Sequence, residues 1–98
     1  MKGREYMEKI VRRHLTFSGW VQGVGFRYRC RHAAAAFGCT GWVRNESDGT
    51  VTVEIQGTGE SIDRVIEAVE RGSFIRIERM ESAEIPVIPD ECGFGTLG

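Results

Sequence analysis

The stretch that decides the fold is residues 19–27, which read Gly19-Trp20-Val21-Gln22-Gly23-Val24-Gly25-Phe26-Arg27. A strand-like run ends just before this stretch, and a helix-like run with four consecutive alanines follows it. Three glycines allow the short connection to adopt positive φ and to turn its amide N–H groups toward one point. The stretch therefore predicts a tight connection from a strand to a helix.

The same connection has the features of an anion-binding site. A helix start adds unpaired N–H groups and the positive end of the helix dipole, and with a glycine loop these form a concave phosphate site. Arg27 follows the loop, and its planar guanidinium can bind a phosphoryl group through two hydrogen bonds. A glycine-rich loop by itself is a weak signal, so a simple turn with a surface arginine is the alternative at this point.

The size and composition of the chain are those of one small domain. Its 98 residues, 41% apolar and 28% charged, are enough for a single hydrophobic core. No stretch approaches the ~20 apolar residues of a membrane span, and the charged N-terminus lacks the hydrophobic region of a signal peptide. We therefore expect one cytoplasmic domain over residues 1–98, with residues 1–9 as a disordered tail.

The cysteines indicate neither a disulfide framework nor a metal site. Cys30, Cys39 and Cys92 cannot all pair within the chain, and an odd number without an export signal indicates reduced thiols. Cys39 stands where strand alternation requires an apolar residue, so we interpret it as a small buried hydrophobe. Cys30 and His32 alone are too few for a zinc site. We expect no metal and no other cofactor.

Charge is distributed unevenly along the chain, although the net charge is only −1. Residues 1–31 contain eight Lys or Arg and two Glu, a net charge of +6, and the rest of the chain carries −7. The positive excess is expected around the glycine loop, where its field would attract a small anionic substrate. A solvated basic surface is the alternative. The small total charge argues against a protein that coats nucleic acid, and no nucleic-acid partner is expected.

The hydrophobic pattern predicts the elements of an α+β fold. We expect strands over residues 11–18, 40–45, 50–56 and 74–85, and helices over residues 26–37 and 59–71. Gly38 is expected to end the first helix, and Asp48-Gly49 to turn the hairpin between the second and third strands. Residues 93–98 could add a short edge strand, although three glycines disfavour it.

This order, β-α-β-β-α-β, is that of a ferredoxin-like split βαβ sandwich, an antiparallel sheet with two helices on one face. The first two strands run in the same direction through a right-handed crossover, and the third lies antiparallel between them. The loop after the first strand and the end of the second strand then lie at the same edge of the sheet. Asn45, which ends the second strand, is therefore expected near the glycine loop. Its alternative role is that of a turn-forming residue.

A second segment, residues 41–51, reads Gly41-Trp42-Val43-Arg44-Asn45-Glu46-Ser47-Asp48-Gly49-Thr50-Val51. With residues 21–27 it resembles the acylphosphatase family, which carries a V-Q-G-V-x-F-R loop followed by G-[aromatic]-V-x-N-x-x-x-G-x-V. Both motifs are present in the family's order and spacing. The resemblance extends at motif level from about residue 15 to residue 57, and as a pattern of elements to about residue 94.

The resemblance implies a role for each residue that matches the motifs. Arg27 would bind the phosphoryl group, and Asn45 would hold the attacking water in line with the P–O bond that breaks. Backbone N–H groups would complete the phosphate-binding loop at Gln22, Gly23, Val24, Gly25 and Phe26. The implied reaction is metal-independent hydrolysis of a small acyl phosphate to carboxylate and phosphate. Nothing in the sequence indicates an obligate dimer, so we expect a monomer.

Two positions depart from the family pattern. Position 20 is often polar or basic in the family, and here Trp20 would lie near the acyl group and affect the choice of substrate. Position 25 is often bulky, and Gly25 resembles the acylphosphatase-like domain of the hydrogenase-maturation carbamoyltransferase, which handles carbamoyl phosphate. The alternative function is a non-catalytic module on the same fold that binds small anions or RNA. The sequence lacks the aromatic-rich motif of RNA-recognition domains, which argues against RNA binding.

Overall fold

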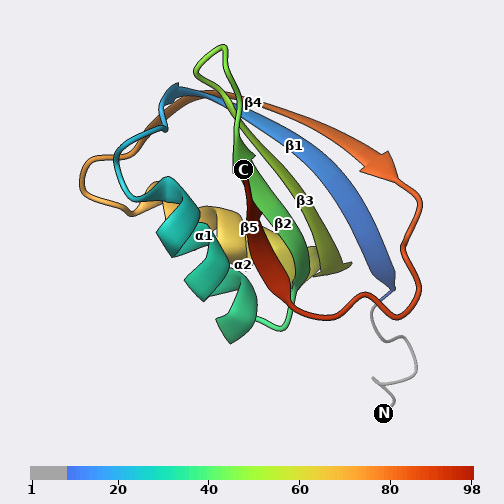
Figure 1. Cartoon of the computed structure of the whole chain (residues 1–98). Helices are drawn as coiled ribbons and strands as arrows, with labels where there is room; N and C mark the ends of the chain where they lie inside the picture. Colours follow the sequence, from blue (N-terminus) through green and yellow to red (C-terminus); the bar gives the residue numbers. More distant parts are fainter. Residues whose placement is uncertain (1–8) are drawn as a thin grey trace.

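Two helices cover one face of a five-stranded sheet (Figure 1). The computed structural model describes residues 9–98, so residues 1–8 of the predicted tail lie outside the described residues. In chain order the elements are β1 (Ile10–Trp20), α1 (Phe26–Ala36), β2 (Thr40–Asn45), β3 (Val51–Thr58), α2 (Gly59–Glu70), β4 (Arg76–Ile85) and β5 (Phe94–Leu97). No helix of the described part is long and apolar enough to cross a membrane.

The strand order is β4-β1-β3-β2-β5, which confirms the predicted ferredoxin-like arrangement. β3 lies antiparallel between β1 and β2, and β4 lies antiparallel to β1. The sheet is mixed and not purely antiparallel, because β5 pairs with β2 in parallel. The chain after β4 crosses to the opposite edge of the sheet before it turns into β5, and this crossing sets the direction of β5 (Figure 1).

The predicted elements are present, and each predicted boundary lies within two residues of the observed one. The end of α1 shows why these boundaries could be predicted. Gly38 adopts a φ of +73°, and the N–H of Cys39 donates to the carbonyl of Ala34 at 2.8 Å. This is the hydrogen-bonding pattern of a Schellman motif, in which a left-handed glycine satisfies the last carbonyls of a helix.

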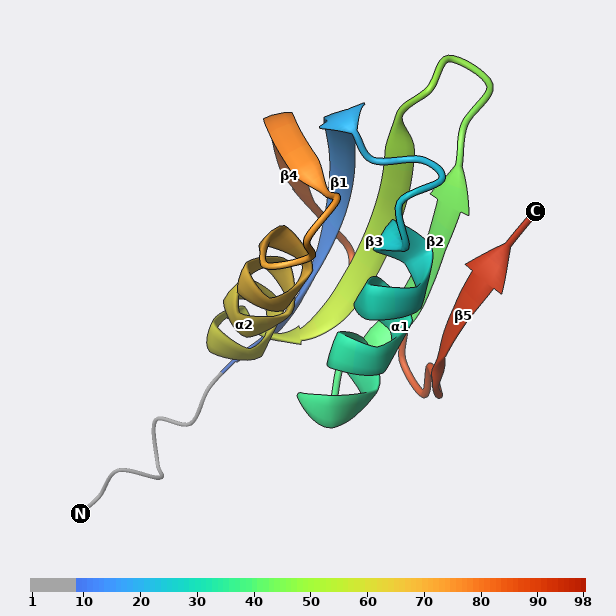
Figure 2. The ribbon, with the colours of Figure 1, turned by 90° about the vertical axis from the view of Figure 1, so that its left-hand side faces the viewer.

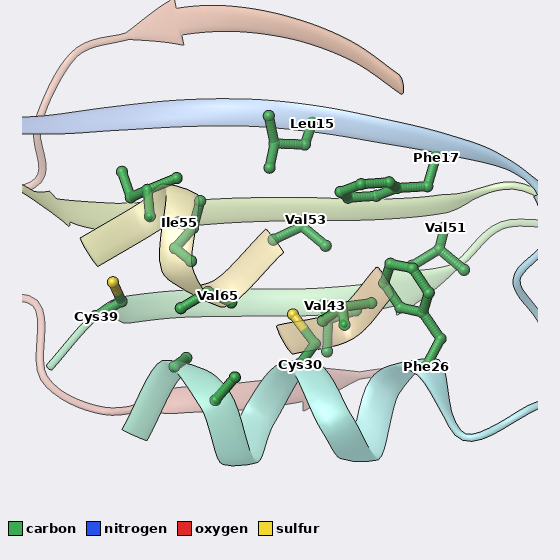
Figure 3. Close-up of a cluster of buried hydrophobic side chains, with 14 of the residues drawn as sticks. Leu15, Phe17, Phe26, Cys30, Cys39, Val43, Val51, Val53, Ile55 and Val65 are labelled. Carbon is green, nitrogen blue, oxygen red and sulfur yellow. The ribbon is translucent and has the colours of Figure 1, made fainter. Parts of the chain in front are cut away.

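The core lies between the sheet and the two helices (Figure 3). Alternate residues of the strands point into it, as the sequence predicts, and they include Leu15, Phe17, Val43, Val51, Val53 and Ile55. The rings of Phe17 and Phe26 pack with their centroids 5.0 Å apart, which joins β1 to the first turn of α1. Burial raises the pKa of Cys30 to about 12 and that of Cys39 to about 11, so both are neutral thiols.

The opposite face of the sheet contains a buried arginine. Arg12 is only 1% exposed, and its guanidinium donates to Glu54 Oε1 at 3.1 Å and to Glu91 Oε1 at 2.7 Å. The hydroxyl of Thr40 donates to the same Glu91 oxygen at 2.7 Å. Because Glu91 belongs to the connection between β4 and β5, these contacts fasten that connection to the sheet.

Two further contacts stabilise this face. The side chain of Gln56 accepts from the N–H of Ile88 and donates to its carbonyl, both at 2.9 Å. His14 Nδ1 lies 2.8 Å from Glu54 Oε2. Burial alone would raise the pKa of Glu54, but hydrogen bonds and charges from His14 and Arg12 outweigh burial and lower it. His14 therefore takes part in a structural contact on the outward face of β1.

Replacing Arg12 with Met should lower the free energy of unfolding by about 3 kcal/mol, because two mostly buried carboxylates would lose their cation. Urea unfolding of Arg12→Met and of the unmodified protein measures this difference. Arg13→Met is the matched control, since Arg13 contacts an exposed Asp63 at 3.3 Å and should cost less than about 1 kcal/mol. Equal losses in the two variants would contradict the structural role given to Arg12.

Candidate functional site

The connection between β1 and α1 adopts the glycine conformations that the sequence predicts. Gly23 and Gly25 have φ values of +73° and +85°, in the left-handed region that favours glycine. Gly25 is the N-cap of α1, no side chain caps the helix, and its first turn contains no acidic residue. The first N–H groups of α1 therefore have no partner within the helix, and the positive end of its dipole is open to an anion.

The side chain of Gln22 joins this loop to the hairpin between β2 and β3. Its Nε2 donates to the carbonyl oxygens of Glu46 at 2.7 Å and Thr50 at 2.8 Å. Those two residues close the hairpin through the Glu46 N–H, which donates to the Thr50 carbonyl at 2.9 Å. Asn45 directly precedes this pair. The amide of Gln22 therefore fixes the end of β2 beside the loop.

A cavity of about 340 Å³ lies where the loop, the start of α1 and the ends of β2 and β5 meet. We call it the anion cavity, and its lining residues are Val21, Gly23, Gly25, Phe26, Arg27, Tyr28, Arg31, Asn45 and Thr96. Figure 2 shows the loop passing from β1 toward the end of β2 before it enters α1. Five of the predicted site residues thus surround a single cavity.

Two predicted loop residues do not line the anion cavity. Gln22 is occupied by the hairpin carbonyls, and its side chain is a positioning element that the sequence did not predict. Val24 packs against the hydrophobic core and lines a neighbouring cavity. The backbone role predicted for both residues stays a prediction.

Asn45 offers an unused acceptor. Its Oδ1 is buried and has no hydrogen-bond partner among residues 9–98. Leaving a buried acceptor unpaired costs about 1–3 kcal/mol, and such groups require an explanation in a folded protein. Since Asn45 lines the anion cavity, its side-chain amide lies beside any molecule that the cavity holds.

Positive charge at the cavity comes from Arg27 and Arg31, which lie four residues apart on one face of α1. Within the described residues neither arginine forms an ion pair. The observed positive charge around the loop is smaller than the sequence predicts. Arg12 lies on the opposite face of the sheet, and Arg29 donates to the carbonyl of Ala68 at 2.7 Å.

Four residues that line the cavity were not predicted as site residues: Val21, Tyr28, Arg31 and Thr96. Arg31 follows Arg27 by one helical turn, so helical periodicity could have identified it. Tyr28, in the first turn of α1, packs against His32 with ring centroids 4.2 Å apart and the ring planes tilted by 40°. Thr96 reaches the cavity only because β5 pairs with β2, and no sequence signal indicates that pairing.

The model of the acylphosphatase family matches residues 13–96. An acylphosphatase of Geobacillus thermodenitrificans is 42% identical over 86 residues, which cover 87% of this chain and 92% of that protein. The chain belongs to the acylphosphatase family. It is therefore a hydrolase, and its family implies small acyl phosphates as substrates. The alternative of a non-catalytic binding module is not favoured.

Solved acylphosphatases share the fold of this chain. The structure from Coxiella burnetii has a TM-score of 0.80 and 33% identity, and the match covers 99% of this chain and 100% of that one. The structure from Bacillus subtilis has a TM-score of 0.82 and 28% identity, with coverage of 90% and 99%. The similarity thus extends over the whole described fold.

Proposed function

We propose that the chain hydrolyses the carboxyl–phosphate bond of small acyl phosphates, with Arg27 and Asn45 as its catalytic residues. One observation supports this assignment above all. Three residues line one cavity: Arg27, which forms no ion pair among the described residues, Gly25 at the open N-terminus of α1, and Asn45, whose buried Oδ1 has no partner among residues 9–98. These groups combine the anion binding and the water positioning that the reaction requires.

The chemistry of acyl phosphates explains why so few groups suffice. An acyl phosphate is a mixed anhydride whose leaving group is a carboxylate, an anion that is stable near neutral pH. Its hydrolysis therefore needs no strong general acid. The enzyme has to stabilise the charge on the phosphoryl oxygens and to orient a water molecule toward phosphorus.

Each group of the site then has one role. The guanidinium of Arg27 and the N–H groups of the loop bind the phosphoryl oxygens. The side-chain amide of Asn45 forms a hydrogen bond with a water and directs its oxygen at phosphorus. A bond forms between the water oxygen and phosphorus, the bond from phosphorus to the acyl oxygen breaks, and the carboxylate leaves with the bonding pair. The water proton passes to phosphate or to solvent.

Cys30 takes no part in this mechanism, although it lies on α1 close to Arg27. It is 2% exposed, and burial raises its pKa to about 12. A nucleophilic cysteine needs the opposite setting, an accessible thiol with a lowered pKa. The proposed reaction therefore has no covalent intermediate on cysteine.

We further propose that residues 1–98 act as one domain and as a monomer in the cytoplasm. The lining of the anion cavity comes from the loop, α1, β2 and β5 of a single chain. The proposed site therefore needs no residue from a second copy.

Arg27→Ala should remove most phosphate affinity and most turnover while the protein stays folded, because Arg27 supplies charge from the rim of the cavity and not to the core. Steady-state kinetics with acetyl phosphate, with phosphate as inhibitor, measure both losses. Arg27→Lys should also be poor, since an ammonium cannot form the two parallel hydrogen bonds of a guanidinium. Arg64→Ala, at an exposed arginine of α2, is the control. A near-normal kcat/KM in Arg27→Ala would overturn the assignment.

Asn45→Ala should lower kcat by ~10²-fold or more, the scale for losing a well-aimed polar group in a transition state. Phosphate inhibition should change little, because Arg27 and the loop amides are retained. The measurements are kcat, the phosphate inhibition constant and Tm on the same variant. An unchanged kcat with a lowered Tm would mean that Asn45 is only a turn residue.

Hydrolysis should continue in excess EDTA, because the proposed roles of Arg27, Asn45 and the loop amides involve no metal ion. The assay compares initial rates before and after prolonged incubation with the chelator. Activity that is lost with EDTA and restored by a divalent cation would show that the mechanism lacks a component.

A further inference from the structure

A second cavity, of about 630 Å³, lies on the other side of the glycine loop. We call it the aromatic cleft, and its lining residues are Trp20, Gly23, Val24, Ser73, Phe74, Ile75 and Arg76. Gly23 lines the anion cavity as well, so the two cavities adjoin at the loop. In the sheet, β2 and β4 lie on opposite sides of β1. By its lining residues the anion cavity extends toward β2, and the aromatic cleft extends toward the start of β4. Figure 2 shows β2 and β4 on opposite sides of β1.

The cleft has two exposed aromatic walls. Trp20 is 68% exposed and Phe74 is 75% exposed, whereas Ile75 beside them is 9% exposed. Aromatic rings that remain in water around a hollow are a frequent feature of binding sites, because a ligand can bury their faces. Arg76 is the charged residue of the lining. The cleft is therefore suited to a flat apolar group and, at one point, to an anion.

The backbone positions Trp20 and Arg76 for this purpose. The register of β1 and β4 shifts between Ser18 and Gly19, where Glu78 of β4 has no partner in β1, and beyond this shift Trp20 lies opposite Arg76. Gly19 has a φ of +123°, and a Cβ at this position would collide with the carbonyl oxygen of Arg76. The close approach of β1 and β4 at this point thus depends on glycine, and the register shift sets which side chains lie opposite each other.

We propose that the aromatic cleft binds the acyl group of the substrate and favours an aromatic acyl group that carries an anionic substituent. This inference rests on the proposed function. In an in-line displacement the leaving group departs on the side opposite the attacking water. With the water held at Asn45, on the β2 side, the acyl group leaves across the loop toward β4. The aromatic cleft lies on that side.

The dimensions and charge of the cleft define the class of acyl group. An acetyl group is too small for a hollow of about 630 Å³ and would leave both aromatic walls in water. A benzoyl group can stack on Trp20 or Phe74. A carboxylate on that ring would gain a hydrogen-bonded ion pair with the guanidinium of Arg76. Trp20, Phe74 and Arg76 are therefore specificity-determining residues.

Three substrates separate these contributions: acetyl phosphate, benzoyl phosphate and 4-carboxybenzoyl phosphate. We expect kcat/KM to rise in that order in the unmodified protein. Trp20→Ala and Phe74→Ala should each lower kcat/KM for the two aromatic substrates by about tenfold, and for acetyl phosphate by much less. Arg76→Gln should lower kcat/KM chiefly for the carboxylated substrate. Phe37→Ala is the matched control, an aromatic residue 39% exposed at the end of α1.

The outcomes distinguish this inference from the proposed function. If acetyl phosphate is hydrolysed but the ratio of aromatic to acetyl kcat/KM is the same in Trp20→Ala, Phe74→Ala and Phe37→Ala, the acyl site is overturned and the function stands. If Arg76→Gln affects benzoyl and 4-carboxybenzoyl phosphate equally, the preference for an anionic substituent is overturned. If none of the three substrates is hydrolysed by the folded protein, the proposed function itself fails.

Discussion

The site depends on the side-chain amide of Gln22. Its two hydrogen bonds, to the carbonyls of Glu46 and Thr50, are the side-chain link between the loop after β1 and the hairpin after β2. The loop carries the amides that are proposed to bind the anion and leads into Arg27, and the hairpin begins after Asn45. In the proposed mechanism, anion binding and water positioning belong to two elements that are separated in sequence, and the side chain of Gln22 links them.

The far face of the sheet supports the same site. β5 brings Thr96 to the anion cavity, and the chain reaches β5 through a connection held by Glu91 on the buried Arg12. The hydrogen bonds between Gln56 and Ile88 fasten an earlier part of this connection. The Arg12–Glu91 ion pair, which lies outside the anion cavity, thus helps to hold β5 as one wall of that cavity. Stability and the shape of the anion cavity are coupled here through the backbone of β5.

Much of this organisation could be predicted from the sequence, because local rules determine it. Gly38 and the alternation of Val51, Val53 and Ile55 fix the end of α1 and the inward face of β3, and the βαβ crossover alone places Asn45 near the loop. The burial of Arg12 and the pairing of β5 could not be predicted in this way. Both depend on partners distant in sequence, Glu91 for Arg12 and β2 for β5, and a glycine-rich end has little intrinsic preference for a strand.

The most direct test of this account is a double-mutant cycle on kcat between Gln22→Ala and Asn45→Ala. If Gln22 acts by holding Asn45 in place, Gln22→Ala should lower kcat by about tenfold when Asn45 is present and have little further effect in the Asn45→Ala background. Such non-additivity would show that the two residues act through one positioned water. Equal losses from Gln22→Ala in both backgrounds would contradict the account.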